Sequence, residues 1–211
     1  MALPSLLDAI LTTLRHQLFP GLLLVSAFLI LADCRLMPWV LLLEYVIVAA
    51  LLAPYLYPVV AASRLGLGFS TWLILLLGTP GKSRYFPEED GQRDALLLAG
   101  LLYRLFGLGL AGVLAYVLWQ AETMFVLPVQ LGLVSIWFTL SGLAAMVLGT
   151  DLLSRGVGLL TLLNGIEMAY LYSQRSLVIF GLLGVTHLVV VLAIAYQRDR
   201  VVALEEEDTS S

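Results

Sequence analysis

The sequence predicts an all-α membrane protein, a polytopic transmembrane helical bundle of about seven spans, and three observations lead to this fold class. Hydrophobic residues make up 61% of the chain and charged residues only 12%, whereas a soluble domain has about 25% charged residues. The apolar residues occur in runs of about 20, the length of helix that crosses a hydrocarbon core of about 30 Å. These runs lack the period-two alternation of transmembrane barrel strands, so helices are predicted.

Seven hydrophobic stretches are interpreted as spans. They cover residues 18–32, 38–57, 59–78, 95–120, 125–148, 153–172 and 177–197. The third stretch follows Pro54 and Pro58 and contains Arg64, so a re-entrant hairpin over residues 59–78 is an alternative to a full span. An arginine near a helix end can extend its side chain to the interface, so Arg64 alone does not indicate function.

One sizeable polar loop, residues 80–94, separates a three-span part (1–79) from a four-span part (95–200), which an acidic tail (201–211) follows. With seven spans, most basic residues near span ends fall on the side of the C-terminus: Arg35, Lys82, Arg84, Arg93, Arg155, Arg198 and Arg200. The opposite side carries Arg15, Arg64 and Arg175. The excess of basic residues on cytoplasmic loops therefore predicts a cytoplasmic C-terminus and an outer N-terminus in the inner (cytoplasmic) membrane.

Residue types exclude several functional classes. Cys34 is the only cysteine, so no internal disulfide, thiolate cluster or c-type haem attachment is expected. His16 and His187 are the only histidines and should lie at different depths, which argues against a bis-histidine haem. The sequence shows no ligand cluster for zinc or di-iron, no catalytic triad, no phosphate loop and no basic tract for nucleic acid. We expect no metal, no cofactor and no catalytic site in this chain alone.

Three ionisable residues lie inside predicted spans: Glu44 in the second, Glu167 in the sixth and His187 in the seventh. A charge at membrane depth costs about 2.5–3.5 kcal/mol on insertion scales, so such residues face protein or water and are candidates for function. Counted from the turn at residues 173–176, Glu167 and His187 lie roughly 12 and 18 Å below the outer surface. Neighbouring helices pack about 8–10 Å apart, so contact through a water or two is expected. Asn164 shares a helix face with Glu167.

Carboxyl and imidazole groups in such surroundings can take up and release protons near neutral pH. Glu167, His187, Asn164 and Glu44 are therefore the candidate residues of a proton path. Structural roles are the alternatives: Glu44 could pair with Arg35 or reach the cytoplasmic interface, and His187 could hydrogen-bond a backbone carbonyl.

Residues 142–200 resemble a known family. They comprise a span, a short charged loop, a span with a central acid, a short turn, and a last span ending in Gln197-Arg198-Asp199-Arg200. This pattern, with Leu162-Leu163-Asn164-Gly165-Ile166-Glu167-Met168, resembles the K subunit of respiratory complex I and the related subunit of Mrp-type antiporters, with a three-helix core at residues 125–200. The resemblance implies that Glu167 matches the glutamate of the family's proton path. His187 stands where the family tends to carry a second acid.

The length and the additional N-terminal spans are most similar to a longer relative, component E of hydrogenase-4 and formate-hydrogenlyase-type complexes. The resemblance implies a membrane subunit of an ion-translocating complex, with large antiporter-like subunits as partners. A non-conducting subunit that docks such a partner is the alternative. A stand-alone transporter or membrane enzyme is a third class, against which the short loops and the lack of a convincing inverted repeat argue.

Overall fold

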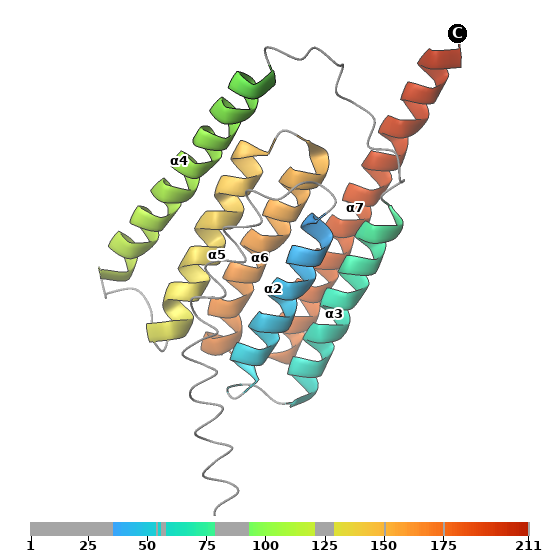
Figure 1. Ribbon diagram of the computed structural model, residues 1–211. Helices are drawn as coiled ribbons and strands as arrows, with labels where there is room; N and C mark the ends of the chain where they lie inside the picture. The colour runs from blue at the N-terminus through green and yellow to red at the C-terminus, as the bar shows by residue number, and fades with distance from the viewer. Residues whose placement is uncertain are drawn as a thin grey trace, which may run out of the picture.

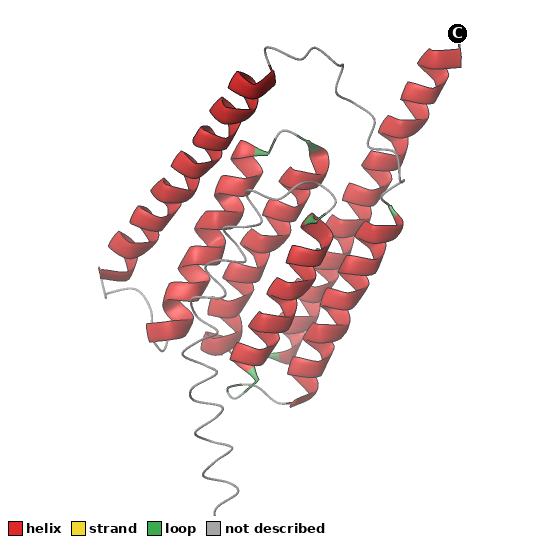
Figure 2. Ribbon diagram, viewed as in Figure 1, coloured by secondary structure: helices red, strands yellow, loops and turns green. Residues whose placement is uncertain are grey.

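The computed structural model describes residues 36–53, 55, 58–78, 93–120, 129–149, 151–174 and 176–210. These residues form six helices and no strand (Figures 1 and 2). The helices are α2 (Met37–Leu52), α3 (Pro58–Leu77), α4 (Arg93–Gln120), α5 (Val129–Leu148), α6 (Leu152–Gln174) and α7 (Leu177–Ser210). The predicted all-α class is therefore confirmed for this part of the chain. The predicted first span, residues 18–32, and residues 80–92 of the polar loop lie outside the described residues.

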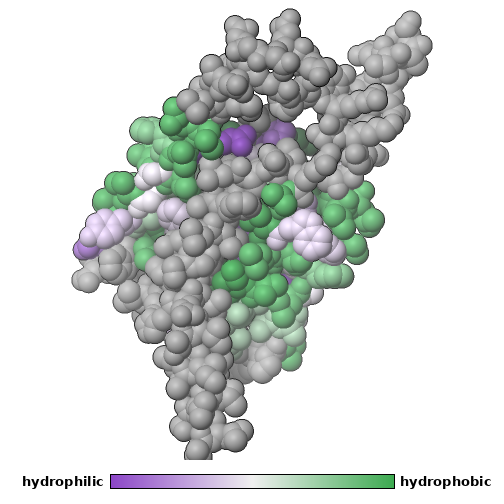
Figure 3. All heavy atoms as spheres, in the orientation of Figure 1, coloured by the Kyte–Doolittle hydropathy of each residue, from purple (hydrophilic) through white to green (hydrophobic). Residues whose placement is uncertain are grey.

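Four of the described helices are long and apolar enough to cross a membrane. Their apolar segments are Val59–Leu77, Leu101–Leu118, Leu131–Leu148 and Leu177–Gln197. Many large hydrophobic side chains on these helices are exposed, and hydrophobic residues cover much of the coloured surface in Figure 3. Such a surface is stable only in an apolar environment, so the chain is a membrane protein. The number of seven spans and their orientation stay predictions.

Two prolines set the boundary between α2 and α3. The second span was predicted to reach residue 57, but α2 ends at Leu52, shortly before Pro54, because proline has no amide hydrogen with which to continue the helical hydrogen bonds. α3 begins at Pro58, and proline is favoured in the first turn of a helix. α3 then continues unbroken for 20 residues, roughly 30 Å, so the re-entrant hairpin is wrong.

The last helix is longer than the predicted span. α7 contains 34 residues, and its apolar segment, Leu177–Gln197, has the predicted bounds. The helix continues through the acidic tail to Ser210 and projects beyond the other helices (Figure 1). No proline or glycine lies after Gly184, so nothing in the backbone ends the helix at the predicted span limit.

α6 is the central element of the bundle. It packs against α5, α7 and α2, while α3 packs against α2 and α7. α4 lies at the edge and packs on α5 (Figure 1). The α5–α6 contact is close because of small residues: a Cβ on Gly158 would lie 2.6 Å from the backbone nitrogen of Met146. Glycine allows helix backbones to approach in this way in membranes.

The buried apolar residues form two clusters. The first contains Met37, Val40, Leu41, Tyr45, Leu75, Ala145, Leu153, Val157, Leu160, Val191 and Ile194. The second contains Ile47, Val48, Leu51, Leu52, Leu131, Val134, Phe138, Met168 and Leu171. On α6 the first cluster ends at Leu160 and the second begins at Met168. The residues between them include the fully buried polar positions of this helix, Thr161, Asn164 and Glu167.

Candidate functional site

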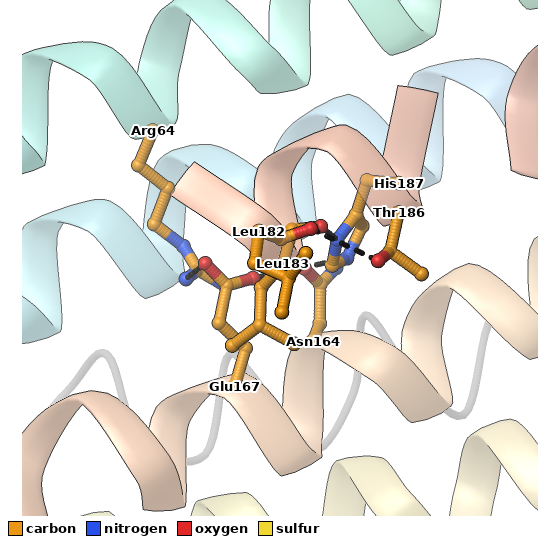
Figure 4. Close-up of polar contacts among 7 residues, drawn as sticks. All are labelled: Arg64, Asn164, Glu167, Leu182, Leu183, Thr186 and His187. Atoms are coloured by element: carbon orange, nitrogen blue, oxygen red, sulfur yellow. Dashed lines mark hydrogen bonds and ion pairs between the residues drawn. The ribbon is translucent and has the colours of Figure 1, made fainter. Parts of the chain in front are cut away.

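An arginine from α3 and two residues of α6 form the centre of a buried polar cluster. Arg64 Nη1 lies 2.9 Å from Glu167 Oε1. Arg64 Nη2 donates a hydrogen bond to Asn164 Oδ1 over 3.2 Å. Asn164 and Glu167 are three residues apart and share a face of α6, so one guanidinium contacts both (Figure 4). All three side chains are 0% exposed.

His187 approaches the same glutamate from α7. Its Nε2 lies 3.7 Å from Glu167 Oε2, whereas Arg64 Nη1 pairs with the other carboxyl oxygen, Oε1 (Figure 4). The other ring nitrogen, Nδ1, lies 2.9 Å from the backbone carbonyl oxygen of Leu183. Tyr45 of α2 packs edge-on against the imidazole, with ring centroids 6.0 Å apart. The imidazole thus packs against α2, faces α6 and is hydrogen-bonded to its own helix.

Glu44 forms a separate polar contact further along α6. Thr161 Oγ1 donates a hydrogen bond to Glu44 Oε2 over 2.9 Å, and both side chains are 0% exposed. Thr161 precedes Glu167 by six residues, an axial rise of about 9 Å. Thr161, Asn164 and Glu167 therefore place two polar sites at different depths along one helix.

The buried positive charge of Arg64 needs a negative charge close by to balance it. Arginine remains charged in proteins, and an isolated buried charge is unfavourable by several kcal/mol. The Glu167 carboxylate balances Arg64 at 2.9 Å. Apolar clusters lie beyond the polar residues toward both ends of α2 and α6. In this conformation the ion pair is therefore closed off from bulk solvent.

The chain does not satisfy every buried polar group of the site. Arg64 Nε, Asn164 Nδ2, Tyr45 Oη and Glu44 Oε1 are buried and lack a hydrogen-bond partner within the described part of the protein. Such atoms are rare in native structures and need an explanation. Among the described residues there is no group of three or more His, Cys, Asp and Glu side chains that could hold a metal ion.

The structure brings together three of the four predicted residues, Glu167, His187 and Asn164. Glu167 and His187 are closer than the contact through a water or two that the depth argument predicted. His187 makes a bond to a backbone carbonyl, that of Leu183, as the alternative for this residue expected; whether its role is structural or functional stays a prediction. Glu44 is fully buried and bonds Thr161, so the alternative of reaching the interface is wrong; Arg35 lies outside the described residues.

Arg64 is the residue of the cluster that the sequence interpretation missed. Its assignment to the outer interface is wrong, because the side chain is fully buried and contacts Glu167. The signal was present in the spacing. Arg64 lies six residues after the start of α3 and Glu167 seven before the end of α6, so both lie about 9–11 Å from helix ends that face the same side.

Comparisons with known proteins yield no match: no family model, no curated protein and no solved structure is similar to this chain.

Proposed function

We propose that the chain is a membrane subunit of an ion-translocating complex related to respiratory complex I, Mrp-type antiporters and membrane hydrogenases, and that it contributes part of a proton path. Its partners would be large antiporter-like subunits in the inner (cytoplasmic) membrane. The chain would supply proton-exchanging side chains and no redox chemistry. The buried contact among Arg64, Glu167 and His187 carries the proposal.

Energetics support a functional reading of this contact. Ionisable residues inside membrane segments are rare because they are unfavourable, and those that persist mark ion or proton pathways. A buried ion pair is weak support for stability, since well-packed apolar residues often replace such a pair without loss. Here two titratable groups, Glu167 and His187, meet at 3.7 Å beside a permanent positive charge. That combination is better suited to binding and releasing a proton than to a role in packing alone.

The second site extends the proposed path. Glu44 and Thr161 lie on the α2–α6 contact, and Asn164 lies between Thr161 and Glu167 on α6. Polar side chains at three-residue spacing thus connect the depth of Glu44 with that of Glu167. Transfer between the two sites would require water or side-chain motion, because an axial rise of about 9 Å exceeds a hydrogen bond.

The test is Glu167→Gln in the purified native complex, reconstituted into liposomes. The amide keeps the size of the side chain but cannot exchange a proton, so we expect coupled proton movement per assembled complex to fall severely. Ser141→Ala is the matched control, because Ser141 is buried on α5 and its hydroxyl donates to the carbonyl oxygen of Phe138 in the same helix. Wild-type pumping by an assembled Glu167→Gln complex would remove the proton-path role.

A non-conducting subunit is the second candidate, and one observation favours it. The Arg64–Glu167 pair is charge-compensated and fully buried, as expected of a contact that only fixes helices. In that case Glu167→Gln would lower the yield of assembled complex and leave transport per complex unchanged. Both candidate functions require large antiporter-like partners. Identifying the chains that copurify with the native complex tests this requirement.

A further inference from the structure

The hydrogen bond at His187 Nδ1 fixes the tautomer of the imidazole. Nδ1 lies 2.9 Å from the backbone carbonyl oxygen of Leu183, and a carbonyl oxygen only accepts hydrogen bonds. Nδ1 therefore carries a hydrogen. In a neutral imidazole one nitrogen is a donor and the other an acceptor, so Nε2 is then unprotonated.

This assignment has a consequence on the other side of the ring. Nε2 faces Glu167 Oε2 at 3.7 Å, and an ionised carboxylate also only accepts hydrogen bonds. Two acceptors thus face each other with no proton between them. The distance exceeds a hydrogen bond of about 2.7–3.2 Å, as expected for two lone pairs that do not attract.

We propose that His187 Nε2 and Glu167 Oε2 form a binding site for one exchangeable proton, oriented by the Leu183 carbonyl. This inference rests on the proposed function and names the place where the proton is held. When loaded, the site holds the proton on Nε2 as an imidazolium beside the carboxylate, or on Oε2 as a carboxylic acid that donates to Nε2. The two forms contain the same atoms and the same number of protons, and both replace a contact between acceptors with a hydrogen bond.

The groups that face the site define its charge. Arg64 of α3 contacts the far carboxyl oxygen, and Tyr45 of α2 contacts the imidazole edge. Glu44 is bonded to Thr161 at another depth. With Arg64 positive, Glu167 negative and His187 neutral, the empty site has no net charge, and one proton makes it +1. A second proton would add another positive charge away from water, so the site takes one.

The experiment is ¹⁵N NMR of the imidazole in the full chain, labelled at histidine and reconstituted in lipid bilayers. His16→Gln leaves His187 as the only imidazole, and His187→Gln in the wild-type background confirms the assignment if the first variant accumulates poorly. We expect Nδ1 to be protonated and Nε2 unprotonated at alkaline pH. On acidification, the Nε2 signal should shift to a protonated or strongly hydrogen-bonded position.

Glu167→Gln is the informative variant, and Glu44→Gln is its matched control. We expect Glu167→Gln to keep the Nδ1 proton and to lose the acid-induced shift of Nε2, whereas Glu44→Gln should leave both signals unchanged. A proton on Nε2 at alkaline pH, or an unaltered acid-induced shift in Glu167→Gln, would overturn the shared site. Neither NMR result depends on transport. Failure of the shared proton site can therefore be distinguished from failure of the proposed function, for which the sign is wild-type pumping by the Glu167→Gln complex.

Discussion

Glu167 connects the other residues of the site because its two carboxyl oxygens face different partners. One oxygen contacts Arg64 at 2.9 Å, and the other faces His187 at 3.7 Å. The sequence allowed Glu167 and His187 to be predicted from their depth, because an ionisable residue in an apolar run is conspicuous. It did not allow their direct contact to be predicted, since depth does not give the rotation of each helix about its axis. Arg64 was missed because an arginine six residues inside a helix can reach either the interface or the interior.

The ion pair predicts non-additive effects on stability. Arg64→Met leaves the Glu167 carboxylate buried without its cation, and removing one partner of a buried pair costs about 3–5 kcal/mol. The double variant Arg64→Met/Glu167→Gln has no buried charge at this position, so we expect it to recover most of that loss. The free energy of unfolding in mild detergent is the measurement. A double variant as unstable as the sum of the single variants would show that the two charges do not interact.

The hydrogen bond between Thr161 and Glu44 predicts a smaller loss of stability than the ion pair does. Thr161→Val keeps the shape of the side chain but removes the hydroxyl that donates to Glu44 Oε2. Leaving a buried acceptor without its partner costs about 1–3 kcal/mol, so the unfolding free energy should fall by that amount. In Thr161→Val/Glu44→Leu the polar partner is also absent, and we expect a smaller loss. Equal losses in both variants would mean that the hydroxyl does not stabilise Glu44.

At the scale of elements, the close α5–α6 contact positions the acid. Most helix limits could be predicted from apolar runs, and Pro54 and Pro58 account for the boundary of α2 and α3. The central place of α6 could not be predicted, because an apolar run does not show which helices pack against one another. α6 is nevertheless not among the four long apolar helices. Its polar residues are accommodated because α2, α5 and α7 surround it.

The close α5–α6 contact predicts that replacing a glycine by alanine affects stability differently at different positions. A Cβ on Gly142 would overlap the backbone nitrogen of Leu162 on α6, whereas a Cβ on Gly109 of α4 meets nothing within 4 Å. Gly142→Ala should therefore force α5 and α6 apart and lower the unfolding temperature. Gly109→Ala should be neutral or stabilising by up to about 1 kcal/mol, since alanine favours helix. Equal tolerance at both positions would contradict the α5–α6 packing.

At the scale of the whole molecule, the described helices form a bundle with polar residues between two apolar clusters. The basic residues flanking the spans predict a cytoplasmic C-terminus. Burial of Arg64 removes one basic residue from the opposite side, which strengthens that bias.

The predicted orientation is tested with reporters. A fluorescent protein that folds only in the cytoplasm, fused after Ser211, should fluoresce, and alkaline phosphatase at the same position should be inactive. The same pair of reporters after Gln174, at the end of α6, should give the opposite result. Matching signals at the two positions would contradict a span between them, and a reversed pattern would invert the orientation.

The central claim, that the cluster moves a proton rather than only joining helices, is tested most directly by proton flux in Arg64→Met/Glu167→Gln. Both charges are absent from this variant, so the complex should assemble, which removes the ambiguity of a variant that fails to fold. The measurement is proton flux per assembled complex in liposomes, compared with wild type and Ser141→Ala. We predict normal assembly with severely reduced flux. Normal assembly with wild-type flux would show that the buried pair is structural.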